Sequence, residues 1–189
     1  MTNPVLDAIR TRRMTRAMTE QPIERDRLEA VLEAARWAPN AGNRRLHRLI
    51  AVQDPRTLRL LRVVSPGMFQ RPVAVVVICI DWGRAAAFGM RHGLRGPYVD
   101  VGTLAQTMLL AAHSLGLGSG IVTSFSQAAV AEVLDVPDDV SPELIVCLGY
   151  AAPNQPAPMR ARNPVTWQAL TDWERFPARG RAGYAEGRT

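Results

Sequence analysis

The spacing of apolar residues predicts a chain of mixed helices and strands. From Glu24 to Trp37 the apolar positions recur about every 3.6 residues and end before Pro39, as in an amphipathic helix. From Val73 to Ile80 the residues are apolar on both faces, which indicates a central strand. We also expect helices over residues 4–10, 55–63, 99–115 and 126–134, and strands over residues 46–52, 118–123 and 144–148.

The hydrophobic pattern also predicts where the folded domain ends. The segment 99–115 is apolar nearly all round, so it predicts a buried helix, which Gly116 ends. After Gly149 the sequence turns to Pro, Ala and Arg, which predicts an extended arm, and the last residues are rich in Gly and charge. We therefore expect an α+β fold with one domain over residues 1–178 and a flexible tail over residues 179–189.

Composition narrows the possible functions. With 47% hydrophobic and 21% charged residues the chain is typical of globular proteins, and no apolar run approaches the roughly 20 residues of a membrane helix. Its polar start lacks a signal-peptide core, so we expect a cytoplasmic protein. Cys79 and Cys147 lie in Val/Ile-rich segments and are expected to be inert core thiols. Dispersed histidines and the lack of a carboxylate pair argue against zinc chemistry and hydrolysis.

The positive charge comes from arginine alone. The chain has 23 basic residues of this one type, no lysine, and a net charge of +6, which excludes Schiff-base chemistry and the lysine-dependent phosphate loop. Arg12, Arg13 and Arg16 cluster after the first helix, and Arg160 and Arg162 lie in the arm. Converging guanidinium groups are suited to a phosphate. The alternative is two solvated basic surface segments.

Two glycine-containing segments have different meanings. The segment from Pro39 to Asn43 is a turn signal, and its two Asn side chains and free amides are also suited to the polar edge of a planar heteroaromatic ring. The segment from Gly116 to Gly120 ends a helix and begins a strand. A dinucleotide-binding fingerprint requires the opposite order, so we reject that interpretation.

The order of four motifs resembles the nitroreductase family over about residues 5–170. These motifs are Ile9–Arg16, Ala34–Asn43, Met108–Ser119, and Leu148–Tyr150 followed by Arg160 and Arg162. The resemblance implies a nitroreductase-like fold with a central, mostly antiparallel sheet flanked by helices. It also implies an interlocked homodimer that binds FMN. A long apolar helix and a proline-rich arm lack enough partners in so small a chain, which agrees with a dimer.

The resemblance also implies the residues of the site. The phosphate, the ribityl chain and the O2 edge of the ring are expected near Arg12, Arg13, Met14, Arg16, Arg160 and Arg162. The loop residues expected from the other subunit are Pro39, Asn40, Ala41 and Asn43, and backbone amides near N5 are expected at Thr123 and Ser124. Met14 replaces a serine of the family pattern and cannot hydrogen-bond phosphate. Arg45 and His47 replace Gln and Trp, which leaves flavin affinity and ring tuning open.

The implied activity is hydride transfer from NADH or NADPH to a nitroaromatic, a quinone or a similar acceptor, by a ping-pong mechanism without a dedicated acid-base residue. Two alternatives stay open. The stretch Leu61–Met68 and the segment Arg160–Asn163 are similar to flavin-dependent cyclic dipeptide oxidases, which favours an oxidase of small amides. The basic charge also allows a non-catalytic anion-binding or nucleic-acid-binding protein, although no nucleic-acid-binding motif is present and we expect no such partner and no membrane partner.

Overall fold

The computed structural model describes residues 3–156 and 166–176 of the chain. The chain divides into two compact units, Met1–Pro156 and Ala157–Thr189. In the second unit, the described part contains the 3-10 helix η2 (Gln168–Leu170), beside which the rings of Trp167 and Trp173 pack edge to face with centroids 6.4 Å apart. The expected domain end at residue 178 remains a prediction, and the expected tail lies outside the described residues.

A four-stranded antiparallel sheet forms the centre of the first unit. Its strands are β1 (His47–Val52), β2 (Ala74–Asp81), β3 (Gly118–Val122) and β4 (Val140–Gly149), in the spatial order β1-β2-β4-β3. The central position predicted for the 73–80 segment is confirmed, because β2 pairs with both β1 and β4 and is buried almost throughout. The predicted antiparallel sheet is likewise confirmed.

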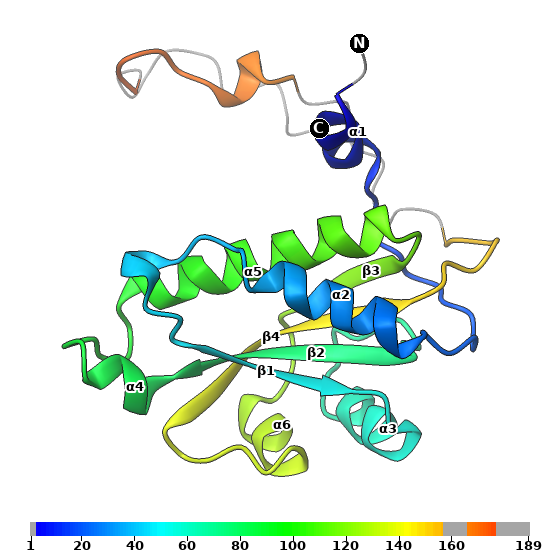
Figure 1. Ribbon diagram of the computed structural model, residues 1–189, viewed down its shortest axis with the longest axis horizontal. Coiled ribbons are helices and arrows are strands. Elements are labelled where there is room, and N and C mark those ends of the chain that lie inside the picture. Colours follow the sequence, from blue (N-terminus) through cyan, green and yellow to red (C-terminus); the bar gives the residue numbers. More distant parts are fainter. Residues whose placement is uncertain (1–2, 157–165, 177–189) are drawn as a thin grey trace, which may run out of the picture. The chain divides into compact units, whose positions relative to one another are not determined.

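Helices cover both faces of this sheet, as Figure 1 shows: α2 (Arg25–Ala35) and α5 (Arg95–Ser114) lie on one face, and α3 (Pro55–Val63) and α6 (Gln127–Val133) lie on the other. Alternate residues of β2 serve the two sides, because successive strand residues point to opposite faces. Val76 packs in the core beneath α2 and α5, whereas Val77 packs in the core beneath α3 and α6. The fold is therefore the α+β arrangement that the sequence predicts.

Side-chain caps begin several helices where the sequence predicts them. Asn3 Oδ1 accepts hydrogen bonds from the amides of Val5 and Leu6 at the start of α1 (Pro4–Thr11). Ser126 caps α6. A short helix that the sequence analysis did not predict, α4 (Trp82–Ala86), follows β2 directly and is capped by the Asp81 side chain.

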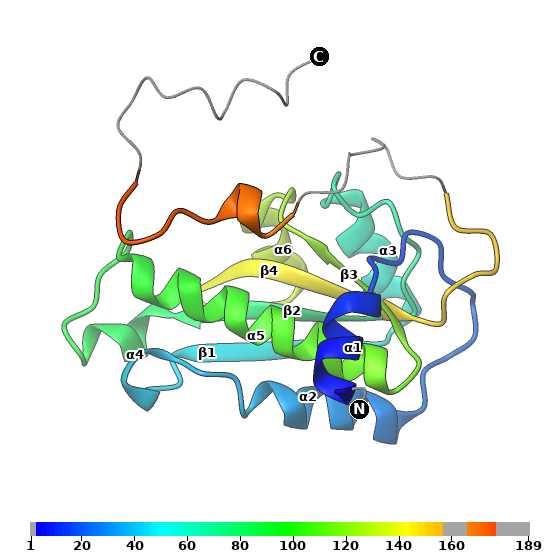
Figure 2. The same ribbon diagram turned by 90° about the horizontal axis from the view of Figure 1, so that it is seen from above.

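Two elements are longer than predicted. Helix α5 begins at Arg95, before the predicted residue 99, because Pro97 falls in the first turn, where its missing N–H costs no intrahelical bond. Strand β4 begins at Val140 although Pro142 and Glu143 interrupt the apolar pattern. Within one chain α5 buries one side only, and Val99 on its other side is 62% exposed. On α1, Ile9 is also 50% exposed. Figure 2 shows the first unit from above, with α5 lying along the sheet.

Candidate active site

The arginine-bearing segment after α1 is held against the edge of the sheet. Met14 forms a parallel bridge with Ser119 on β3, and the Thr15 amide donates to the Ser119 carbonyl at 2.8 Å. Farther along, Gln155 Oε1 accepts from the amide of Arg16 at 2.9 Å. A side chain at Gly118 would collide with Thr15, since a Cβ there would lie 2.7 Å from Thr15 Oγ1. The segment thus extends the sheet beyond β3.

The three arginines of this segment have different surroundings. Arg12 Nη1 is buried and has no hydrogen-bond partner among the described residues, and the same holds for Ser119 Oγ. Arg13 Nη1 instead donates to the carbonyls of Arg10 at 2.6 Å and Arg12 at 3.0 Å. Arg16 is exposed. A buried donor without an acceptor is costly, so Arg12 is suited to receive an anionic ligand.

Thr123 and Ser124 lie at the opposite end of β3 and are both exposed. The Ser124 carbonyl accepts a hydrogen bond from the Gly67 amide at 2.9 Å, which fixes the loop before β2 beside this strand end. Thr123 lies four positions after Ser119, or about 13 Å along a strand. An elongated ligand lying along β3 would therefore contact both ends.

Helix α5 holds the loop after Pro39. Both Asp100 carboxylate oxygens lie within hydrogen-bonding distance of the Ala41 amide, at 3.1 and 3.0 Å, and Thr103 Oγ1 donates to the Pro39 carbonyl at 2.8 Å. Asn40 Oδ1 turns inward and accepts from the Arg45 amide at 3.1 Å.

The backbone of this loop is unusual. Gly42, Asn43 and Arg45 have positive φ of 64°, 53° and 51°, a region that non-glycine residues seldom occupy. Such strain persists only where the surrounding contacts impose it. The hydrogen bonds to α5 and within the loop are the contacts that do so here.

The two predicted halves of the site meet opposite ends of α5 within one chain. The 39–45 loop is bonded to Asp100, whereas Thr11, next to the arginine segment, is bonded to His113 through Oγ1 and Nε2 at 2.9 Å. His113 lies thirteen positions after Asp100 on the helix, which corresponds to about 20 Å. Arg160 and Arg162 lie outside the described residues. One chain brings Arg12, Met14, Thr123 and Ser124 to the same edge strand, but not the loop.

Several polar residues of this region were missed by the sequence analysis. Asp100 is 6% exposed. It is the single acid of a long apolar helix, and this feature of the sequence could have identified it. Gln70 is also buried, with Oε1 lacking a partner among the described residues, and its amide packs so closely on Gly120 that a Cβ there would lie 2.3 Å away. No sequence signal distinguished Gln70 or Ser119 from other polar loop and strand residues.

The cysteines and histidines carry no metal site in the described part of the chain. Burial raises the pKa of Cys79 and of Cys147 to about 12, and both thiols are free, as expected for inert core residues. Across residues 3–156 and 166–176, no helix has the length and apolarity to traverse a bilayer.

Comparison with known proteins identifies the family. The family model for nitroreductases matches residues 9–73 and 61–150. An oxygen-insensitive NADPH nitroreductase of Salmonella typhimurium is 30% identical over 164 residues, which span 80% of this chain and 68% of that protein. An FMN reductase (NAD(P)H) of Bacillus subtilis is 29% identical over 168 residues, which span 79% of this chain and 67% of that protein.

Solved structures agree with this match. A nitroreductase family protein from Clostridium difficile 630 superposes with a TM-score of 0.77 at 25% identity and covers 93% of this chain and 100% of its own. Nitroreductase A from Vibrio parahaemolyticus shares the fold, with a TM-score of 0.80 at 23% identity over 94% of this chain and 78% of its own. The resemblance predicted from the motif order is confirmed: this chain belongs to the nitroreductase family.

Proposed function

We propose that this chain is an FMN-dependent NAD(P)H oxidoreductase that works as a homodimer. The observation that carries the proposal is the arginine segment along β3, where Arg12 Nη1 and Ser119 Oγ are buried and lack partners among the described residues. A phosphate group would satisfy both atoms, since it accepts charge-assisted hydrogen bonds from guanidinium and ordinary ones from hydroxyl.

The residues at the two ends of β3 support the proposal that FMN lies along this strand. Arg12 and Ser119 lie at the end of β3 suited to the phosphate, and the exposed Thr123 and Ser124 lie at the other end, beside the ring in this proposal. Met14 contributes its backbone to the bridge with Ser119, so its thioether need not bind phosphate. When bound, FMN supplies the two-electron chemistry, and the protein binds, orients and electrostatically tunes it.

The protein's own contribution is mainly electrostatic. Arg16 is held through its backbone by Gln155 and has an exposed side chain, so it is our candidate for the cation beside the O2 edge of the ring. A fixed positive charge there stabilises the negative charge that develops on reduction.

The dimer is part of the same proposal. The separation of about 20 Å along α5 supports an arrangement in which the 39–45 loop serves the arginine segment of a second chain. The exposed apolar residues Val99 on α5 and Val5 and Ile9 on α1 supply a surface for that contact. Arg160 and Arg162 are proposed to complete the phosphate site.

NADH or NADPH is the proposed electron donor, supported by the names of the Salmonella and Bacillus relatives. The proposed acceptors are nitroaromatics, quinones and similar small molecules. The purified protein should be yellow, and stopped-flow mixing with NADH or NADPH should bleach the flavin bands before an acceptor restores them. Absence of bleaching with both nucleotides would overturn the reductase proposal, and oxygen consumption with cyclic dipeptides would then favour the oxidase.

A further inference from the structure

A basic cavity borders helix α3. Its volume is about 560 Å³, within the roughly 300–1,000 Å³ typical of small-molecule pockets. It is bounded by α3, by the segment before α2 and by the segment before β2. None of its lining residues belongs to the proposed FMN site. Its lining residues are Glu20, Pro22, Gln53, Pro55, Leu58, Arg59, Arg62, Arg71, Pro72 and Val73.

The cavity concentrates positive charge. Arg59 and Arg62 lie one turn apart on α3, so their side chains share a helix face, and Arg71 comes from the segment before β2. None of the three takes part in the ion pairs found among the described residues. Three guanidinium groups exceed what a single carboxylate ligand requires, whereas a phosphate with three terminal oxygens can engage all of them.

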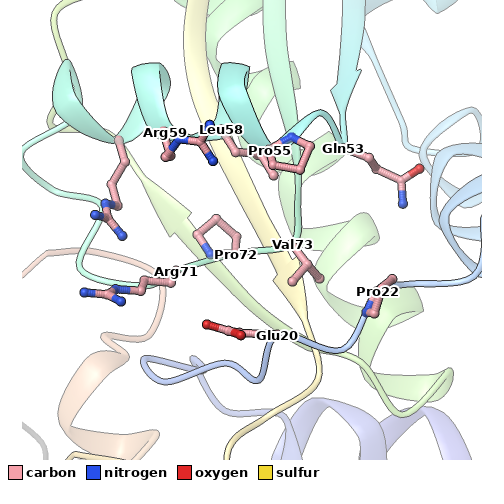
Figure 3. Close-up of a pocket in the computed structure, with 10 residues that line it drawn as sticks. Glu20, Pro22, Gln53, Pro55, Leu58, Arg59, Arg71, Pro72 and Val73 are labelled. Carbon is pink, nitrogen blue, oxygen red and sulfur yellow. The ribbon is translucent and has the colours of Figure 1, made fainter.

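The rest of the lining is apolar or accepts hydrogen bonds. Figure 3 shows Arg59 and Arg71 toward one end of the cavity and Gln53 and Pro22 toward the other, with Leu58, Pro72 and Val73 between them. Gln53 Nε2 donates to the Ile23 carbonyl at 3.2 Å, which orients the amide and leaves its carbonyl oxygen as an acceptor. The Glu20 carboxylate lies below Pro72, on the side of Arg71, in Figure 3.

We propose that this cavity binds a small phosphomonoester with an apolar body. The phosphate lies among Arg59, Arg62 and Arg71. The body packs on the proline and aliphatic side chains. This site is additional to the active site and does not depend on the proposed function.

The test is calorimetric titration of the purified, FMN-loaded protein with phenyl phosphate, with inorganic phosphate and phenol as reference probes. Phenyl phosphate should bind at least fivefold more tightly than either reference, because only this probe uses both the cationic end and the apolar wall. Equal affinity for inorganic phosphate would contradict the proposal that the ligand has an apolar body. Absence of phenyl phosphate binding would contradict the proposal that the cavity is a binding site.

Variants locate the binding. The double substitution Arg59→Gln/Arg62→Gln should weaken phenyl phosphate binding at least tenfold and leave the flavin spectrum unchanged. Arg56→Gln, on the same helix but not part of the lining, should change affinity less than twofold. Equal losses in both variants would mean that the ligand responds to net charge alone and would overturn the proposal. If the protein holds no FMN, the same comparison still tests the cavity, because the substituted residues lie outside the proposed flavin site.

Discussion

The carboxylate of Asp100 accepts the backbone N–H of Ala41, with oxygen-to-nitrogen distances of 3.1 and 3.0 Å. The acid is buried on α5, and the amide belongs to a loop with three positive-φ residues. Because a buried charged acceptor stabilises a hydrogen bond more than a neutral one does, this contact is a main restraint on the loop conformation.

Replacing Asp100 with Ala should destabilise the fold by about 1.5–3 kcal/mol, the usual contribution of a hydrogen bond to a charged group. The substitution leaves the Ala41 amide without its acceptor, so FMN affinity should fall as well. Urea unfolding and fluorescence titration with FMN measure the two effects. Asp138→Ala, which removes an exposed acid, is the control and should change stability by less than about 0.5 kcal/mol. Equal unfolding midpoints for the two variants would contradict this role of Asp100.

Arg12→Gln should weaken FMN binding by roughly 10- to 100-fold, because a charge-assisted hydrogen bond contributes about 1.5–3 kcal/mol. The fold should be retained, since Arg12 Nη1 has no partner to lose among the described residues. Titration of the apoprotein with FMN provides the measurement. Arg10→Gln, on the exposed last turn of α1, is the matched control. An Arg12 variant that binds FMN within twofold of the wild type would remove the phosphate role of this residue.

Gly118→Ala should separate the arginine segment from β3. The new Cβ would lie 2.7 Å from Thr15 Oγ1 and 2.8 Å from Thr15 Cγ2, closer than real Cβ contacts allow. We expect a loss of about 1–3 kcal/mol in stability together with weaker FMN binding. In the control Gly96→Ala, the added methyl group meets no atom within 4 Å, so stability should be unchanged or higher. Unchanged flavin affinity in Gly118→Ala would argue against this segment as the phosphate site.

The two thiols should be unreactive in the folded protein. Burial raises the pKa of Cys79 and Cys147 to about 12, above the ordinary thiol pKa of 9.0, so the folded state keeps protons that the unfolded state loses at alkaline pH. The stability that these thiols contribute is thus complete below about pH 9 and declines as pH rises toward 12. Disulfide-exchange labelling at pH 8 should detect no reactive thiol until denaturant is added. The urea midpoint of a Cys79→Val/Cys147→Val variant should decline less steeply above pH 9 than that of the wild type.

The fold could be predicted from the sequence because each of its signals comes from residues that are close together in the chain. The period of α2, the doubly apolar β2 and the Asn3 and Ser126 caps depend on residues within a few positions of each other. Helix α4 was missed because its five residues are too few to display a period.

The candidate site could be predicted from the sequence only in part. Arginine spacing predicted the cluster at residues 12–16 but not which guanidinium is free for a ligand: Arg13 bonds to the nearby backbone carbonyls of Arg10 and Arg12, whereas Arg12 Nη1 is buried without a partner among the described residues. The contact between Asp100 and Ala41 spans 59 residues in sequence, and the basic cavity joins three distant segments. Neither leaves a local pattern that could predict it.

The 39–45 loop and the arginine segment lie far apart within one chain. A substitution that impairs the loop and one that impairs the arginine segment can therefore be placed in different subunits of the proposed dimer. In the proposed dimer, each flavin would take its loop from one chain and its phosphate contacts from the other. A mixed dimer of Arg12→Gln and Asp100→Ala chains would hold one unimpaired centre and one with both defects. At an FMN concentration too low to load either impaired site, co-expression of the two variants should then recover up to half of the wild-type turnover per mixed dimer, a complementation that a site contained in one chain would never produce.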